Sequence, residues 1–146
     1  MGTNRLLNLG GRIRKRPNGD WLVGRGATAI SSNDTLAISS GGNICVYSRT
    51  AKPLGMFKLP GGEIPVGLSF ANDQTLFTHT KRKGYFLTLS GKLLGGVKTP
   101  LRELVDGRAV PFAAVKGTEL WYVTTKPLKL IRYRIPSSIV AKMPAN

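Results

Sequence analysis

The stretch that decides the fold is Asn33-Asp34-Thr35-Leu36-Ala37-Ile38, which returns about forty residues later as Asn72-Asp73-Gln74-Thr75-Leu76-Phe77. Further along each copy, Leu54-Gly55 is answered by Leu94-Gly95 at the same spacing. A third, looser copy begins at Gly117-Thr118-Glu119-Leu120-Trp121-Tyr122. Short apolar runs that recur at this period, with polar turns between them, predict one unit of β hairpins used several times.

Turn signals between these runs predict an all-β domain of antiparallel hairpins and meanders. The chain has 146 residues, with 18 glycines and 9 prolines, and from its turns we expect roughly eight to ten short strands. We divide it into a basic extended arm (1–20), an all-β domain (21–136) and a C-terminal tail (137–146). Residues 100–106 are the best helix candidate, because Pro100 could start a helix and Gly107 could end it.

The charge balance indicates the kind of partner. The chain carries 22 Lys and Arg against 7 Asp and Glu, a formal net charge of +15. An excess of this size favours polyanions such as nucleic acid, an anionic membrane or a large acidic complex, with a merely basic surface as the simpler alternative. No run is long enough to cross a bilayer and no secretory signal is present, which favours an intracellular or virion-associated protein.

Residues able to carry catalysis or bind a metal are few. His79 is the single histidine and Cys45 the single cysteine, so a nucleophilic triad or a cysteine-based metal site is not expected. Cys45 stands in an apolar run, which predicts a buried structural thiol. Asp34 and Asp73 occupy equivalent turns, which favours a turn role over a catalytic one. The sequence therefore predicts a protein that is not an enzyme and needs no cofactor or metal.

Basic clusters are the positive functional signal. They lie in the N-terminal arm, at a predicted hairpin tip and in an alternating strand whose basic face includes two arginines. Such side chains could follow a phosphate backbone without reading bases. Neighbouring Tyr85, Phe86 and Tyr133 are better explained by core packing than by stacking on bases. The predicted contact residues are Arg12, Arg14, Lys15, Arg16, Lys81, Arg82, Lys83, Arg132 and Arg134.

The stretch from Val66 to Leu76, an alternating strand, a polar turn and a second apolar strand, resembles a blade of WD-repeat-like β-propellers. The resemblance covers about residues 27–135, and the histidine and Trp-Asp signatures of true WD repeats are absent. The order of the runs 44–47, 54–55 and 66–70 is also distantly similar to the N-terminal propeller of vacuolar-sorting tethering subunits, which would imply a role in vesicle tethering.

Two or three blades cannot close a ring, because closed propellers have about four to eight. Either the chain pairs with copies or partners, or it is a small sandwich or barrel that imitates blades. We therefore expect a basic structural or accessory subunit that docks into a ribonucleoprotein or viral particle and binds phosphates without sequence specificity. A propeller-type protein interaction module in a vesicle-tethering complex is the alternative.

Overall fold

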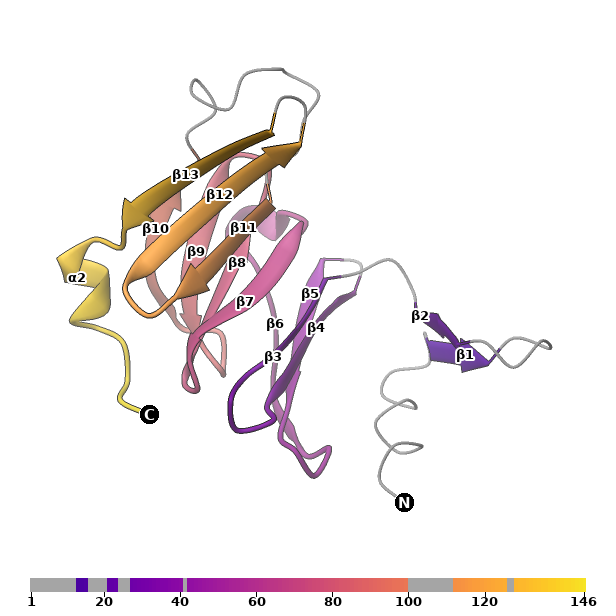
Figure 1. Ribbon diagram of the computed structural model, residues 1–146. Helices are drawn as coiled ribbons and strands as arrows, with labels where there is room; N and C mark the ends of the chain where they lie inside the picture. The colour runs from indigo at the N-terminus through magenta and orange to yellow at the C-terminus, as the bar shows by residue number, and fades with distance from the viewer. Residues whose placement is uncertain (1–12, 16–20, 24–26, 41, 100–111, 126–127) are drawn as a thin grey trace.

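The computed structural model describes residues 13–15, 21–23, 27–40, 42–99, 112–125 and 128–146 (Figure 1). Almost all regular structure in these residues is antiparallel strand, in four separate sheets. The expected all-β class is confirmed. The helix expected at 100–106 lies outside the described residues.

Three of the sheets follow one another along the chain, and we call them blades 1 to 3. Blade 1 contains β3 (Thr28–Ile30), β4 (Leu36–Ser40), β5 (Asn43–Tyr47) and β6 (Pro53–Lys58). Blade 2 contains β7 (Gly67–Asn72), β8 (Thr75–His79), β9 (Lys83–Thr88) and β10 (Leu93–Lys98). Blade 3 has three strands, β11 (Phe112–Lys116), β12 (Glu119–Thr125) and β13 (Leu128–Arg134).

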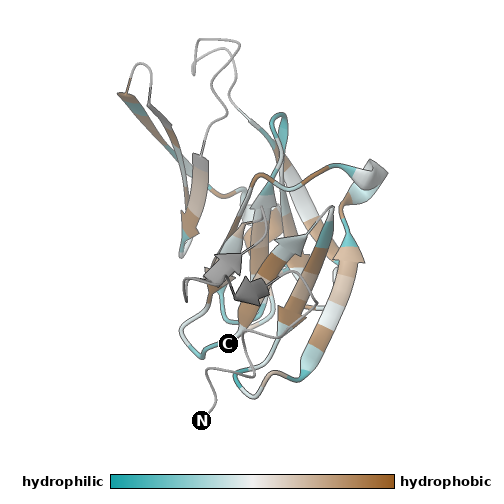
Figure 2. Cartoon of the chain, turned by 90° about the vertical axis from the view of Figure 1, so that its right-hand side faces the viewer, coloured by the Kyte–Doolittle hydropathy of each residue, from teal (hydrophilic) through white to brown (hydrophobic). Residues whose placement is uncertain are grey.

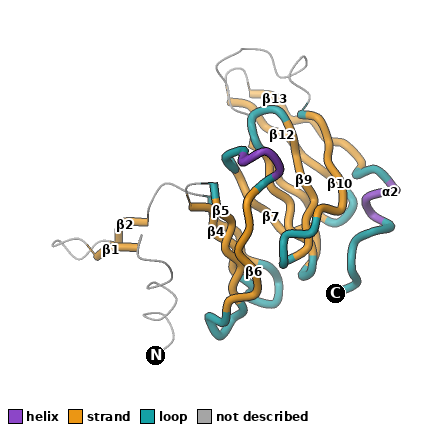
Figure 3. Tube along the Cα trace, turned by 180° about the vertical axis from the view of Figure 1, so that it is seen from behind, coloured by secondary structure: helices purple, strands orange, loops and turns teal. Residues whose placement is uncertain are grey.

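Shorter elements surround the blades. Within the described residues, the strands β1 (Ile13–Lys15) and β2 (Trp21–Val23) pair with each other alone, and their hairpin lies outside the blades on the side of blade 1 (Figure 1). A 3-10 turn, η1 (Pro60–Gly62), follows β6. The helix α2 (Ser137–Val140) lies beside β10, as Figure 3 shows from behind.

Each blade is a meander in which every strand pairs with its neighbour in the chain. The first strands, β3, β7 and β11, are the innermost, because β7 contacts both of the others. The blades therefore stack face to face around a common axis.

The core consists of two layers, one on each side of blade 2. Ala37, Ile44 and Val46 of blade 1 pack with Leu76 and other residues of blade 2 in the first layer. Phe77, next to Leu76, points the other way and packs with Leu120 and Tyr122 of blade 3. Successive side chains of a strand point to opposite faces, so the alternation in β8 supplies both layers. Figure 2 shows the apolar residues along these strands.

The forty-residue echo extends to individual hydrogen bonds. In the turn after β5, the Lys52 amide donates to Ser48 Oγ (3.2 Å) and the Ala51 amide to the Ser48 carbonyl (2.8 Å). In the turn after β9, the Lys92 amide donates to Thr88 Oγ1 (3.0 Å) and the Gly91 amide to the Thr88 carbonyl (3.0 Å). Both turns place a positive φ at their fourth residue, Ala51 or Gly91. The two blades thus share one turn structure as well as a pattern of apolar residues.

The repeated glycines Gly55 and Gly95 allow close packing between segments. A Cβ on Gly55 would overlap the carbonyl oxygen of Leu89 in the next blade, and one on Gly95 would lie 2.6 Å from Ile139 Cγ1 in α2. Only a residue without a side chain fits such positions.

The estimate of eight to ten strands was too low, because the described residues contain thirteen. One unexpected strand, β10, includes the pair Gly95-Gly96, which weakens strand propensity. Another strand beyond the estimate, β1, falls in the segment expected to be an extended arm. Within the expected tail, Ile139 is buried in the layer between blades 2 and 3.

Candidate interaction surfaces

The face of blade 1 that points away from blade 2 is apolar over two of its cross-strand rows, while a third row contains Ser40, Asn43 and Lys58. Cross-strand register places Thr28, Ile38, Cys45 and Met56 in one row and Ile30, Leu36 and Tyr47 in the next. Met56 is 75% exposed and Ile30 66%, and neither core layer of the described chain includes any of these residues. We call this set the outer face of blade 1. Cys45 is half-buried on it, so the expectation of a buried thiol was wrong: its neighbours Ile44 and Val46 occupy the core side of β5.

The same positions are covered in blade 2. Forty residues after Leu36, Cys45 and Tyr47 stand Leu76, Tyr85 and Leu87, and all three are buried against blade 1. The outer face of blade 1 therefore corresponds to the face of blade 2 that packs against the blade before it.

Blade 3 also presents an outer face, which is mixed in character. Register places Ala114, Trp121 and Arg132 in one row and Lys116, Glu119 and Arg134 in another. The Arg132 guanidinium carbon lies 5.6 Å from the centre of the Trp121 ring, and Arg132 Nη1 lies 3.6 Å from Glu119 Oε1. Both charged side chains remain well exposed, so this ion pair contributes little to stability. We call these residues, with Val123 and Leu130, the outer face of blade 3.

The predicted basic residues fall in three separate places. Lys81, Arg82 and Lys83 are exposed at the tip between β8 and β9, and Arg132 and Arg134 are exposed on blade 3. Arg14 and Lys15 lie in β1, opposite Leu22 and Trp21. Arg12 and Arg16 lie outside the described residues.

Sequence reasoning missed one basic residue beside the hairpin tip. Lys98 stands opposite Lys83 in the β9–β10 pairing, and it lines a small groove of about 190 Å³ together with Arg134. Lys98 thereby connects the tip of blade 2 to the edge of blade 3. A hairpin in which Lys83 pairs with Lys98 would have revealed this residue. The strand β10 that forms its second half was not expected from the sequence.

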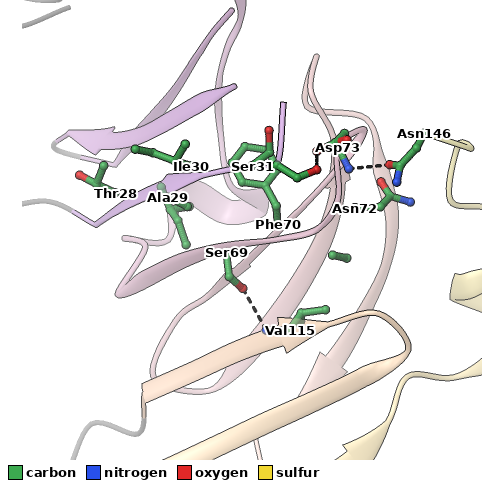
Figure 4. Close-up of a pocket in the computed structure, with 13 residues that line it drawn as sticks. Thr28, Ala29, Ile30, Ser31, Ser69, Phe70, Asn72, Asp73, Val115 and Asn146 are labelled. Carbon is green, nitrogen blue, oxygen red and sulfur yellow. Dashed lines mark hydrogen bonds between the residues drawn. The ribbon is translucent and has the colours of Figure 1, made fainter. Parts of the chain in front are cut away.

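A second groove, of about 500 Å³, runs between the inner strands β3 and β7 (Figure 4). At its mouth, Asp73 Oδ1 accepts hydrogen bonds from Ser32 Oγ (2.7 Å) and the Asn33 amide (3.3 Å), while the Asp73 amide donates to Asn146 Oδ1 (2.7 Å). Deeper in, Ser69 Oγ accepts from the Val115 amide (3.1 Å). The Asp73 carboxylate thus joins the equivalent turns of blades 1 and 2, and its amide joins them to Asn146, which is consistent with the expected turn role.

His79 has a structural contact. It is fully buried, and its Nε2 accepts a hydrogen bond from the Ala113 amide of β11 (3.2 Å). Burial lowers the pKa of His79, and a weaker interaction with the Thr80 backbone opposes the shift. A Cβ on Gly67 would lie 2.5 Å from Nε2, so the ring is enclosed. Among the described residues, no group of three or more His, Cys, Asp and Glu side chains could hold a metal ion.

Aromatic side chains near the basic clusters belong to the packing. Phe86 is completely buried, Tyr85 is buried and donates from its hydroxyl to Glu63 Oε2 (3.2 Å), and Tyr133 packs on the layer between blades 2 and 3. Their expected role in the core is confirmed. In the described part of the chain, no helix is both long and apolar enough to span a membrane.

No protein-family model and no curated protein matches this chain. Among solved structures, it is similar to the virginiamycin B lyase from Staphylococcus aureus, at 20% identity and a TM-score of 0.51, over 84% of this chain and 48% of that one. The Dos1 propeller (13% identity, TM-score 0.48) matches over 87% of this chain and 37% of that one. The Cps50 (Swd1) β-propeller domain from Myceliophteria thermophila (11%, 0.47) matches over 76% and 44%.

These likenesses concern the fold. The chain has a β-propeller-like architecture, as the resemblance in its sequence predicted. It spans about half or less of the length of the structures that it matches.

Proposed function

We propose that this chain is a protein interaction module that acts without catalysis and engages protein partners through the outer faces of blades 1 and 3. The observation that carries this proposal is the exposure of Met56 and Ile30 on a face whose counterpart in blade 2 is buried. An exposed apolar face of this kind favours association, because burying one large apolar side chain contributes about 1.5–3 kcal/mol.

A substitution on the outer face of blade 1 tests this role. Met56→Glu places a charge on that face at a position 75% exposed. Ile64→Glu is the matched control, because Ile64 is 70% exposed and lies between blades 1 and 2 in sequence, outside the outer face. In affinity capture from a nuclease-treated extract, we expect Met56→Glu to lose proteins that the wild type and Ile64→Glu retain. Equal recovery by all three baits would contradict the proposal.

The absence of catalysis in this proposal is supported by two contacts. His79 is enclosed and occupied by a backbone amide, and Asp73 is engaged by hydrogen bonds to the neighbouring turn. A general acid or base must reach its substrate within hydrogen-bond distance, and the enclosed His79 ring does not.

Binding of phosphates is a second candidate function, favoured by the exposed cations Lys81, Arg82 and Lys83 and by the proximity of Lys98 and Arg134. The remaining contacts would come from Arg12, Arg14, Lys15, Arg16 and Arg132. A ribonucleoprotein or a viral particle is the kind of assembly that would need such a subunit, whereas a vesicle-tethering complex would use the protein-binding faces.

Salt dependence tests the second candidate. Replacing Lys81, Arg82 and Lys83 together by Gln should weaken binding of a single-stranded RNA, measured by fluorescence anisotropy, and reduce the salt slope by about 0.7 for each phosphate that is no longer neutralised. Replacing Arg49, Lys52 and Lys58 by Gln is the control, because it removes the same charge from exposed positions of blade 1. Identical losses in both triple variants would show that net charge alone matters, and binding that ignores salt would exclude this candidate.

A further inference from the structure

The place of β2 in the chain order carries an inference that rests on the proposed function. β6, the outermost strand of blade 1, comes before β7, the innermost strand of blade 2. β10 stands before β11 in the same way. β2 precedes β3, the innermost strand of blade 1, with only residues 24–27 between them. By this order, β2 has the place of the outermost strand of a blade that would precede blade 1.

Among the residues that the structure describes, blade 3 lacks that same strand. Within the described residues, blades 1 and 2 have four strands, blade 3 has three, and β13 pairs with β12 alone. Residues 135–146 are all described and contain no strand. Instead, the chain turns at Pro136 into α2, whose Ile139 packs beside Gly95. In the described part of the chain no strand pairs with the outer edge of β13, and such an edge is a template for another strand.

β2 cannot fill the place beside β13 of its own chain, because three blades span too small an arc to bring blade 1 back to blade 3. Closed propellers need about four to eight blades. A second copy of the chain carries β2, the strand that has this place in the chain order. Two copies of a three-blade chain supply six blades, which is within that range.

We propose that two copies assemble head to tail into a closed ring of six blades. The outer face of blade 1 in each copy packs on the outer face of blade 3 in the other, and β2 of each copy adds the fourth strand to the partner's blade 3. A two-fold axis repeats this contact, so both outer faces are covered at once and none remains to extend the assembly. Met56 and Ile30 of one copy then pack against Trp121, Val123 and Leu130 of the other. This contact resembles the packing of blade 2 against blades 1 and 3 within one chain.

The extent of the structural match agrees with this assembly. The three blades correspond to 48% of the virginiamycin B lyase chain from Staphylococcus aureus. Two copies therefore contain about as much propeller as that chain.

The net charge gives the ring an electrostatic signature. Each copy carries +15, and the outer face of blade 1 contains no acidic residue. Association of this face with the mixed outer face of blade 3 thus works against like-charge repulsion between the two copies, which salt screens. Added salt should strengthen a ring of two copies, whereas it should weaken two copies bridged by nucleic acid.

The molar mass in solution is the first test. Light scattering on the nuclease-treated 146-residue chain should give twice 15.8 kDa, with a dimer fraction that rises with protein concentration and with salt. Ile30→Glu should shift the protein to monomer, and Ile64→Glu, the same change at a similarly exposed residue, should leave the dimer intact. A monomer at all concentrations, a series of larger oligomers, or equal effects of the two variants would each overturn the ring.

Cys45 provides a reporter within the native sequence. It is the single cysteine and lies on the outer face of blade 1, so the ring would cover it. Its rate of reaction with a thiol reagent should fall as the concentration of protein rises, and Ile30→Glu should abolish that dependence. A labelling rate independent of concentration would show that the face stays open.

The proposed pairing of β2 with β13 of the other copy needs a test of its own. Leu22→Pro removes a backbone donor from β2, and we expect the dimer to dissociate about tenfold more readily, whereas Leu22→Ala keeps that donor and separates the backbone effect from the side-chain effect. An unchanged dimer in Leu22→Pro would overturn the strand exchange. A monomeric wild type that still loses captured proteins on Met56→Glu would overturn the ring and leave the proposed function standing.

Discussion

At the residue scale, His79 holds blades 2 and 3 together in its neutral form. The Nε2 lone pair accepts the Ala113 amide, so protonation would remove the acceptor and leave a charge in the core. The pKa of His79 is lowered mainly by burial. Below pH 6.5 the unfolded chain therefore binds a proton that the folded chain does not, and stability falls as the pH falls.

The pH dependence of unfolding measures this effect. His79→Gln can keep an acceptor but does not titrate, so the stability of the wild type relative to this variant should decline below pH 6.5, by at most about 1.4 kcal/mol per pH unit. Chemical denaturation at a series of pH values, run on both proteins, gives the difference. A constant difference would show that His79 keeps its ordinary pKa.

The equivalent turn residues Ala51 and Gly91 should respond oppositely to exchange. Ala51 has φ 62°, so Ala51→Gly relieves strain and should stabilise by about 0.5 kcal/mol after the entropic cost of glycine. Gly91 has φ 92°, and a Cβ there would lie 2.5 Å from Phe57 Cγ, so Gly91→Ala should cost more than about 1 kcal/mol. Thermal unfolding of the two variants checks the signs, and two changes of the same sign would contradict the shared turn structure.

The sequence was sufficient to place these turns but not their contacts. The spacing of Asn33-Asp34 and Asn72-Asp73 predicted equivalent turns, because Asn and Asp bond their own backbone locally. The bond from Ser32 to Asp73 joins residues 41 apart, and no local rule predicts it. The same holds for Cys45, whose apolar neighbours predicted burial, while the side chain points to the opposite face of β5.

At the scale of elements, the junction between β6 and the β9–β10 turn depends on Gly55. Gly55→Ala would set a methyl group against the Leu89 carbonyl and 3.1 Å from Ser90 Cα, which are backbone atoms that cannot rotate away. We expect a loss of about 3 kcal/mol. Gly96→Ala is the control, because its Cβ would approach no heavy atom closer than 3.4 Å, and it should cost less than about 0.5 kcal/mol. If chemical denaturation gave similar losses of stability for both variants, β6 and the β9–β10 turn would have to lie further apart than described.

The strand β10 shows why propensity failed at this scale. Gly95 and Gly96 argue against a strand when only the local sequence is considered. In the structure Gly95 gives Ile139 of α2 the space to reach the core, so a contact across 44 residues explains what looked like a local defect. The repeated Leu-Gly of the echo was the available signal, since Gly55 in β6 and Gly95 in β10 occupy the same place in their strands.

At the scale of the whole molecule, blade 2 should be the most protected part of the fold. All five residues of β8 are buried, because blade 2 is covered on both faces, whereas blades 1 and 3 are each covered on one. Amide exchange follows local opening, so we expect β8 to exchange more slowly than β4 and β12 in hydrogen–deuterium exchange mass spectrometry. Faster exchange in β8 than in either neighbour would be inconsistent with the stacked blades. In the ring of two copies, protection of β4 and β12 would rise with concentration.

The class of the fold followed from the sequence because the echo, the turns and the alternation agree. The open ends of the stack of blades did not follow from the sequence. Leu36 and Tyr47 show no local feature that distinguishes them from their buried counterparts Leu76 and Leu87. The position of blade 1 at the end of the stack leaves Leu36 and Tyr47 only half-buried. Exposure of this kind is a property of the arrangement and not of the local pattern.

The shared turn at Ser48 and Thr88 has a consequence for how such a chain can grow. Because both turns make the same bonds forty residues apart, a second copy of residues 48–87, inserted before Thr88, would meet matching partners at each junction. Near-ultraviolet circular dichroism of the lengthened protein would reveal whether the added segment packs. A single tandem duplication would then change the number of blades without requiring a new turn.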